Sequence, residues 1–252
     1  MGEPNAPLHE VFYSLQGEGL WVGVPQVFVR VAGCDLACWY CDTAAARRAG
    51  AEWRMDLLGI APSARSNPAT AREMAELLSE WFALPDHPPV HSLALTGGEP
   101  LLYPDFIEGL AAALGEVRVP LYLETGGHHP EELARVLPWV DYVALDYKLP
   151  STLPTPVSPD IFARAIRIAS QKPSFVKVVV TDSIRDEELW DACHVIAKAQ
   201  PRAPVVLQPV TGTSRAGAPP TAAQLEHWVT VAGACGLDIR VIPQCHKLLG
   251  LR

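Results

Sequence analysis

The chain has 252 residues, of which 49% are hydrophobic and 19% are charged, a balance that supports a packed core and argues against global disorder. Its 20 Lys and Arg residues against 28 Asp and Glu residues give a formal net charge of −8, so we expect neither nucleic-acid binding nor membrane binding through bulk charge. No stretch reaches the roughly 18 apolar residues of a membrane span, and residues 1–10 lack a secretory signal pattern. We therefore expect a cytoplasmic protein whose thiols stay reduced.

Strand-like and helix-like segments alternate along the chain from residue 26 onward. The predicted strands are the short apolar runs 26–32, 91–96, 119–124, 140–146, 175–180, 205–208 and 238–242. The predicted helices are 69–82, with Thr70 as its N-cap, 106–114, 131–137, 160–170, 186–199 and 221–233. Repeated strand–helix units predict an α/β fold in which a mostly parallel sheet with outer helices forms a full or partial (βα) barrel.

Residues 44–68 do not fit this alternation. They contain Arg47, Arg48, Arg54 and Arg65 and show little clear periodicity. One interpretation is a mobile surface insertion, and the other is a flap over the site whose arginines help to hold an anionic substrate. Because no linker or internal repeat is visible, we expect one domain over residues 1–252 that carries this insertion.

The residues most suited to chemistry follow the predicted strands, and in barrels of this kind the site lies at the carboxyl ends of the strands. These strand-end groups are Gly33-Cys34, Thr96-Gly97-Gly98-Glu99, Glu124-Thr125-Gly126, Asp146-Tyr147-Lys148 and Gln208-Pro209. We therefore expect them to converge on one site.

Three of the six cysteines, Cys34, Cys38 and Cys41, have the spacing C-x3-C-x2-C, which lets their thiolates converge on one metal centre. A disulfide does not use three cysteines and is disfavoured in a reduced compartment. Structural zinc has four closed ligands and catalytic zinc usually mixes donor types, and no fourth Cys or His lies within twenty residues on either side. The remaining option is an iron–sulfur cluster with one iron open to a small molecule. A zinc-binding module is the non-enzymatic alternative.

The dispersed cysteines are expected to be buried as small apolar residues: Cys193, Cys235 and Cys245.

The cysteine spacing, together with the segment from Thr96 to Pro100, resembles the radical S-adenosylmethionine (SAM) superfamily. This resemblance implies a [4Fe–4S] cluster held by Cys34, Cys38 and Cys41, with SAM bound to the open iron and cleaved to a 5′-deoxyadenosyl radical. It also implies that Gly97, Gly98 and Glu99 hold the amino group of SAM, and its partial barrel agrees with the predicted elements.

The segments Ser14–Gly19, Cys41-Asp42-Thr43 and Pro243–Lys247, together with Arg30, are similar to the 7-carboxy-7-deazaguanine synthase family. The resemblance runs from about Leu8 to Leu249, interrupted at 44–68. It implies a radical SAM lyase that converts 6-carboxy-5,6,7,8-tetrahydropterin to 7-carboxy-7-deazaguanine with loss of ammonia, in 7-deazapurine and queuosine biosynthesis. It further implies Mg²⁺, a homodimer and a reducing partner such as a flavodoxin.

The resemblance and side-chain chemistry together suggest a role for each site residue. The residues expected to bind the pterin are Leu15, Gln16, Gly17, Glu18, Arg30, Thr96 and His246. Those expected to bind SAM are Tyr40, Cys41, Asp42, Gly97, Gly98, Glu99, Glu124, Asp146, Tyr147, Lys148 and Gln208. The hydroxyl of Thr43 is expected to bind Mg²⁺.

Bland alternatives exist for four of these residues. Arg30 could form a surface salt bridge, Thr43 could cap the following helix, Tyr40 could be a core aromatic, and His246 could be structural.

A different enzyme class is also open: a radical SAM activase that makes a glycyl radical on a partner protein uses the same cysteine and glycine motifs, although a protein substrate needs no pterin edge such as Gln16-Gly17-Glu18. Some family members end in a residue that folds onto the substrate, whereas this chain ends in Gly250-Leu251-Arg252, so that contact is not expected here.

Overall fold

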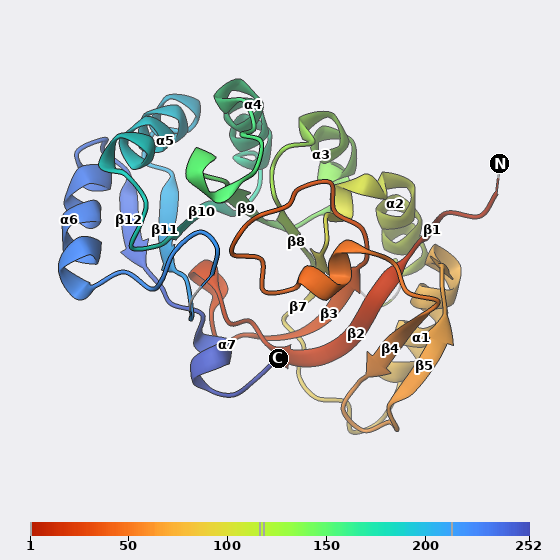
Figure 1. Ribbon diagram of the computed structural model, residues 1–252. Coiled ribbons are helices and arrows are strands. Elements are labelled where there is room, and N and C mark those ends of the chain that lie inside the picture. The colour runs from red at the N-terminus through yellow and green to blue at the C-terminus, as the bar shows by residue number, and fades with distance from the viewer. Residues whose placement is uncertain (1, 116, 118, 213) are drawn as a thin grey trace.

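The computed structural model describes residues 2–115, 117, 119–212 and 214–252, and a ten-stranded sheet forms its centre (Figure 1). Across the sheet the strands lie in the order β12 (Asp238–Val241), β11 (Pro204–Pro209), β10 (Ser174–Val180), β9 (Tyr142–Tyr147), β8 (Leu121–Thr125), β7 (Ser92–Gly97), β3 (Pro25–Val31), β2 (Leu8–Leu15), β4 (Glu52–Asp56) and β5 (Ser63–Ser66). Among the described residues the edge strands β12 and β5 do not pair with each other, so the barrel is open. The predicted partial barrel is confirmed. A short antiparallel pair, β1 (Asn5–Ala6) and β6 (Ala69–Thr70), lies beside it.

Strand β3 and strands β7 to β12 run parallel, and helices cover their outer face (Figure 1). These helices are α1 (Ala71–Phe82), α2 (Pro104–Ala113), α3 (Pro130–Val136), α4 (Pro159–Ala169), α5 (Asp186–Ala199) and α6 (Ala222–Gly233). Short 3-10 turns and one last helix complete the chain: η1 (Gly19–Trp21), η2 (Ala44–Arg47), η3 (Pro100–Leu102), η4 (Leu137–Trp139), η5 (Pro150–Thr152) and α7 (Cys245–Leu248). All six predicted helices and all seven predicted strands are present. None of the helices described has the length and apolar character needed to cross a membrane.

Strand β2 is an element that the apolar pattern did not predict. It runs antiparallel to β3, with Leu8 opposite Val31 and Leu15 opposite Pro25. Its end therefore lies at the amino-terminal edge of the parallel strands. As a result the segment that follows β2 enters the barrel from that edge, opposite to the strand-end motifs.

Residues 44–68 are more ordered than the sequence suggested, because β4 and β5 form a hairpin that extends the sheet beyond β2. Trp53, Met55 and Leu57 are buried, whereas Glu52 and Arg54 face outward, which is the alternation of a half-buried strand. The expectation of a segment without a clear period was therefore wrong, because polar and apolar residues already alternate from 52 to 57 in the sequence.

The sheet has a separate apolar core on each face. The larger core lies between the sheet and the outer helices and includes most of the buried apolar residues of the helices. The smaller one fills the inside of the barrel and consists of Phe12, Phe28, Ala94, Tyr122, Ala144, Phe175 and Val206, with Leu20, Trp21, Tyr142 and Ile242 packed against them. The rings of Phe12 and Phe28 stack with centroids 4.9 Å apart. This inner core closes the amino-terminal end of the barrel and forms the floor of the cavity described below.

The predicted cap of α1 provides a test of local stability. The Thr70 hydroxyl accepts a hydrogen bond of 3.1 Å from the backbone N–H of Glu73. Because this bond satisfies a donor that the helix cannot, Thr70→Ala is expected to lower the free energy of unfolding by about 1 kcal/mol. Urea unfolding of the cluster-free protein measures the change. Thr230→Ala, at an exposed position of α6, is the control and should stay within about 0.5 kcal/mol of wild type.

Candidate functional site

A cavity opens on the inner face of the barrel, and nearly every residue predicted for the site lines it. The predicted residues in its wall are Leu15, Gln16, Gly17, Glu18, Arg30, Cys34, Cys38, Tyr40, Cys41, Asp42, Thr43, Thr96, Gly97, Gly98, Glu99, Glu124, Asp146, Lys148, Gln208 and His246. These residues come from both edges of the sheet. The first four arrive from the amino-terminal edge, at the end of β2 and directly after it, and the strand-end motifs arrive from the carboxyl edge.

Tyr147 is the exception and corrects the sequence-based prediction. Its ring is buried against Phe162 of α4, with centroids 4.2 Å apart and an angle of 28° between the planes, and it is not part of the cavity wall. Successive side chains of a strand point to opposite faces. Since Asp146 faces the cavity, its neighbour Tyr147 must face the outer helices.

The loop from Gly97 to Glu99 is tied to the end of β3, directly before the first cysteine. The N–H groups of Gly98 and Glu99 donate to the carbonyl oxygens of Val31 and Gly33, at 3.0 and 2.8 Å. A Cβ atom on Gly98 would lie 1.8 Å from the Gly33 carbonyl oxygen, so no other residue fits this contact. The two loops are thereby held in fixed register.

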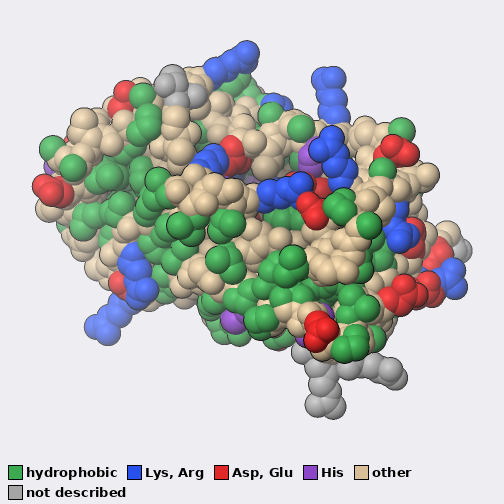
Figure 2. Space-filling model, turned by 90° about the horizontal axis from the view of Figure 1, so that it is seen from below, with side chains coloured by type: hydrophobic (Ala, Val, Ile, Leu, Met, Phe, Trp, Pro, Cys, Tyr) green, Lys and Arg blue, Asp and Glu red, His purple; other side chains and the backbone are tan. Residues whose placement is uncertain are grey.

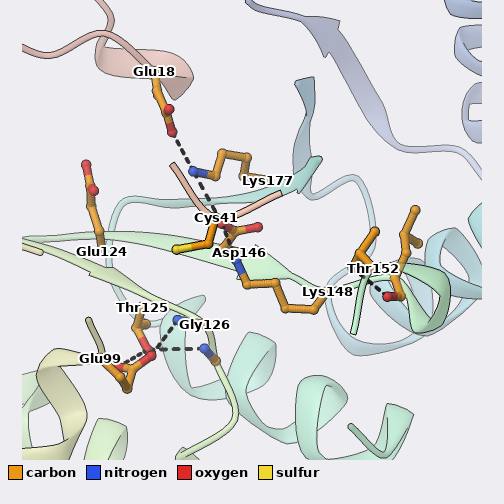
Figure 3. Close-up of polar contacts among 12 residues, drawn as sticks. Glu18, Cys41, Glu99, Glu124, Thr125, Gly126, Asp146, Lys148, Thr152 and Lys177 are labelled. Atoms are coloured by element: carbon orange, nitrogen blue, oxygen red, sulfur yellow. Dashed lines mark hydrogen bonds and ion pairs between the residues drawn. The ribbon is translucent and has the colours of Figure 1, made fainter. Parts of the chain in front are cut away.

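Glu99 is 2% exposed and uses both carboxylate oxygens within the protein (Figure 3). One oxygen accepts from the Thr125 hydroxyl at 2.7 Å and from the Leu101 N–H at 3.1 Å, and the other accepts from the Gly126 N–H at 2.8 Å. Glu99 therefore couples the glycine loop to the end of β8. Its predicted contact with the SAM amino group stays a prediction.

The three clustered cysteines lie on one loop, are half-buried and line the cavity together. Burial raises the pKa of Cys34 to about 11 and also raises the pKa of Cys38. Without a metal the thiols of Cys34 and Cys38 are protonated, so metal binding there releases protons. Three thiols facing one cavity fit a [4Fe–4S] cluster with an open iron. Of the three dispersed cysteines, Cys193 is buried, as the sequence predicted. Cys235 and Cys245 are partly exposed, which corrects the expectation for those two.

Gln16, Glu124 and Thr96 form a hydrogen-bonded group across the cavity. The Gln16 amide donates to Glu124 Oε1 at 2.7 Å and to Gln26 Oε1 at 3.0 Å. The Thr96 hydroxyl donates to Glu124 Oε2 at 2.6 Å. The segment after β2 and the ends of β7 and β8 therefore meet, as the sequence predicted, in one hydrogen-bonded group.

Lys177 of β10 is a site residue that was missed in the sequence (Figure 3). Its ammonium lies 2.5 Å from Glu18 Oε2 and 3.3 Å from Asp146 Oδ2, and Lys148 Nζ lies 2.6 Å from the same Asp146 oxygen. Burial opposes its charge, but Asp146 and Glu18 raise the pKa of Lys177 well above its usual value. Burial likewise raises the pKa of Glu18, but Lys177 and Gln244 lower it to about 2. A single lysine inside the apolar strand SFVKVVV was the available signal.

The C-terminal segment packs on the loop after β2, and Gln244 is a second residue that was missed. Its amide donates to Glu18 Oε1 and to Asp42 Oδ2, both at 2.9 Å. Asp42 also pairs with Lys247 at 2.8 Å. A Cβ on Gly17 would lie 2.2 Å from the His246 ring, which explains the glycine. His246, Glu18 and Asp42 place ligand atoms within 4.8 Å of one another, so they could also hold a cation at the cavity wall.

Three arginines contribute positive charge to the cavity wall: Arg30, Arg47 and Arg252. Arg30 donates from Nε to Glu10 at 2.9 Å, so it makes the ion pair of the bland interpretation and lines the cavity as well. Arg47 is the one arginine of 44–68 among the described lining residues. Arg252 pairs with Asp56 at 2.8 Å and lies 5.9 Å from the centre of the Phe12 ring. The tail therefore reaches the cavity wall, although no contact with the substrate was expected from it.

Four buried polar atoms of lining residues have no hydrogen-bond partner among the described residues. They are the Tyr40 and Tyr122 hydroxyls, Asp146 Oδ1 and Gln208 Oε1. Buried polar groups are nearly always hydrogen-bonded, so each unpaired one needs an explanation. Two acceptors and a hydroxyl beside the cysteines suit a ligand with amino and hydroxyl groups, as SAM has. The Tyr40 ring lies 5.2 Å below Lys148 Nζ, so it forms cavity wall and is no ordinary core aromatic.

A partial barrel with three cysteines that face one cavity defines a class of protein, and comparison with known proteins finds that class. The model of the Radical SAM superfamily matches residues 28–196. The fold is similar to the crystal structure of QueE from Escherichia coli, with a TM-score of 0.62 and 20% identity over 96% of this chain and 95% of that chain. It is also similar to Streptococcus suis SuiB bound to precursor peptide SuiA, with a TM-score of 0.57 over 94% of this chain and 49% of that one.

Three relatives named 7-carboxy-7-deazaguanine synthase are similar over nearly their whole length. The protein from Geobacter sulfurreducens is 36% identical over 99% of both chains. The one from Methanopyrus kandleri is 34% identical over 98% of this chain and 94% of its own length, and the one from Archaeoglobus fulgidus is 33% identical over 98% and 100%. This chain belongs to the 7-carboxy-7-deazaguanine synthase family of the radical SAM superfamily.

Proposed function

We propose that this chain catalyses the radical ring contraction of 6-carboxy-5,6,7,8-tetrahydropterin to 7-carboxy-7-deazaguanine with release of ammonia, in the synthesis of 7-deazapurines such as queuosine. The observation that carries this proposal is a single cavity that unites the three cysteines with the polar group of Gln16, Thr96 and Glu124. The names of the relatives support it. The cavity wall runs from Phe12 to Arg252, which supports one domain over the whole chain.

The residues of the cavity fit the cofactors of this reaction. Cys34, Cys38 and Cys41 would hold the [4Fe–4S] cluster, while the unpaired acceptors of Asp146 and Gln208 would bind SAM. When bound, the cluster and SAM supply a 5′-deoxyadenosyl radical that removes a hydrogen atom from the substrate. Lys148 forms an ion pair with Asp146, and Lys177 forms one with Glu18. These ion pairs hold the side chains of this wall in place.

The substrate would lie against the opposite wall. The Gln16 amide uses both N–H groups on Gln26 and Glu124, whereas each Glu124 oxygen accepts one described hydrogen bond and can accept another from the pterin edge. The guanidinium groups of Arg30 and Arg47 suit the substrate carboxylate, because each is a planar fork of donors. In the described contacts of Arg30 only Nε is engaged, so its two terminal nitrogens face no competing protein acceptor.

A homodimer and a small reducing partner are part of the proposal. Hydrophobic side chains gather over the lower face of the molecule (Figure 2), where α7 lies (Figure 1). The exposed large apolar residues in or near α7, η1 and β12 are Val22, Val241, Leu248, Leu249 and Leu251. Apolar patches of this kind mark protein interfaces, which supports a dimer contact there.

The hydroxyl of Thr43 is expected to bind Mg²⁺ at the cavity wall. Thr43 precedes η2, yet its side chain makes no capping hydrogen bond, so the alternative role as a helix cap is not realised. Thr43→Ala is expected to raise the Mg²⁺ concentration for half-maximal activity about tenfold, equivalent to about 1.4 kcal/mol. Thr43→Ser keeps the hydroxyl and should restore the wild-type requirement. An unchanged Mg²⁺ response in the alanine variant at full cluster content would remove Thr43 from this role.

Product identity tests the proposed reaction directly. Reconstituted protein, SAM, Mg²⁺ and dithionite under anaerobic conditions should convert the carboxytetrahydropterin to a product with the mass of 7-carboxy-7-deazaguanine, with ammonia formed in equal amount. If SAM is cleaved while the pterin stays intact, the assignment fails and an activase acting on a protein becomes the better interpretation. Colourless, zinc-loaded protein would instead indicate the zinc-binding module.

A further inference from the structure

A second group of metal-ligand side chains lies outside the cavity, where the cysteine loop meets the loop between β8 and α3. Asp35 stands between Cys34 and Cys38, while His128 and His129 precede α3. His128 Nε2 lies 2.7 Å from Asp35 Oδ1, and His129 Nε2 lies 3.0 Å from Asp35 Oδ2. The three ligand atoms all lie within 4.8 Å of one another. Two imidazoles and a carboxylate thus converge from two loops.

The far nitrogen of each histidine faces another carboxylate. His128 Nδ1 lies 3.8 Å from Glu99 Oε2, and His129 Nδ1 lies 3.9 Å from Glu132 Oε2. Both separations are longer than a hydrogen bond, but the orientation is that of metal-binding histidines, which typically direct the other ring N–H toward a carboxylate. His128 is 7% exposed at its side chain, and its Nδ1 is buried with no hydrogen-bond partner among the described residues. A simple hydrogen-bonded His–Asp–His group explains the inner contacts but not this outer arrangement.

We propose that Asp35, His128 and His129 form a binding site for a divalent first-row transition metal ion, with Zn²⁺ as the representative ion. Imidazole and carboxylate donors suit such ions. Three protein ligands leave at least one position for water, and the Asp35 side chain is 44% exposed, so solvent reaches the site. None of the three residues is part of the cavity wall, so this site is distinct from the one proposed for Mg²⁺.

The bound ion would fasten the cysteine loop to the end of β8. Glu99 already links the glycine loop to Thr125 and Gly126, and the metal site adds a cross-link from the same strand end to the residue after Cys34. Its effect is to restrain the loop that carries the cluster ligands. The proposed metal site is formed by residues of these two loops, so it does not depend on which substrate the enzyme converts.

Zinc binding by the holoenzyme tests the proposal. Protein with a complete cluster is dialysed against Zn²⁺ in excess Mg²⁺, and zinc and iron are counted per chain. Wild type is expected to take up one saturable Zn²⁺ in addition to the cluster iron, and the double variant His128→Gln/His129→Gln should lose it. Glutamine keeps an amide donor for Asp35 but is a poor ligand, so iron content should not change.

The matched control is His227→Gln. His227 forms an exposed pair with Asp186 at 2.7 Å, which resembles half of the proposed site, and its loss should leave zinc uptake unchanged. Zinc X-ray absorption of wild type should show imidazole and oxygen ligands without sulfur. Equal uptake by wild type and the double variant, no saturable uptake by wild type, or sulfur ligation would each overturn the proposal. The wild-type measurements decide the question even if the double variant fails to fold.

Discussion

Replacing Cys34 by alanine is expected to remove the iron–sulfur cluster and all SAM cleavage. Cys34, Cys38 and Cys41 are the three thiols that face the cavity, and a cluster that already has one open iron has no spare protein ligand. Loss of one thiolate therefore leaves a second iron of the cluster without a protein ligand. Among the described residues, no other cysteine lines the cavity to replace it.

Iron per chain, the visible absorption of the cluster and 5′-deoxyadenosine formation measure this effect together. Cys235→Ala is the matched control, because Cys235 is a partly exposed thiol that is not part of the cavity wall, and this variant should keep full iron and activity. A Cys34→Ala protein that still forms 5′-deoxyadenosine would contradict the ligand assignment. A loss of iron in both variants would point to general instability of the chain.

The parts of the site that were predictable from the sequence are those encoded within a few neighbouring residues. The cysteine spacing is local, and so is the Gly97-Gly98 pair, whose tight approach to Gly33 accepts no side chain. The parallel strands were predictable because buried strands read as short apolar runs between helices. These features need no knowledge of which distant segments meet.

The parts that escaped prediction depend on contacts between distant segments or on strand parity. Lys177 acquires its role from Glu18, 159 residues away, and Gln244 from Asp42, 202 residues away. Tyr147 was assigned to the wrong face because a strand-end motif does not reveal which of its residues points inward. In residues 52–57 the signal was present, since the alternation of a strand was visible there, but the cluster of arginines concealed it.

Replacing Lys177 by methionine is expected to impair both stability and activity. Its ammonium bridges Glu18 and Asp146 in the cavity wall, so its loss leaves two carboxylates without their shared partner. Breaking a buried ion pair on one side typically costs about 3–5 kcal/mol. The lowered pKa of Glu18, from 4.5 to about 2, reflects the same ion pair and corresponds to about 3 kcal/mol. Displacement of this wall by about 1 Å should reduce kcat/KM about 100-fold.

The pH dependence distinguishes this effect from a simple loss of packing. A carboxylate whose pKa is lower in the folded state stabilises the protein above pH 4.5 and loses that contribution as the pH falls toward 2. In Lys177→Met the hydrogen bond from Gln244 remains, but the ammonium no longer offsets burial, so the pKa of Glu18 rises and the variant should show less of this acid-induced loss. The difference in unfolding free energy between wild type and variant should therefore be largest near neutral pH and shrink below pH 4.5. Urea unfolding of the cluster-free proteins across this range measures it.

Two further variants separate the ion pair from other effects of the substitution. Lys198→Met changes an exposed lysine of α5 and should leave both stability and kcat/KM nearly unchanged. The double variant Lys177→Met/Glu18→Gln removes an unpaired charge and should recover part of the stability, because a buried charge is costly mainly when it lacks a partner. A stability difference that stays constant with pH, or a double variant no more stable than Lys177→Met, would show that the charge of Lys177 is not what holds this wall of the site.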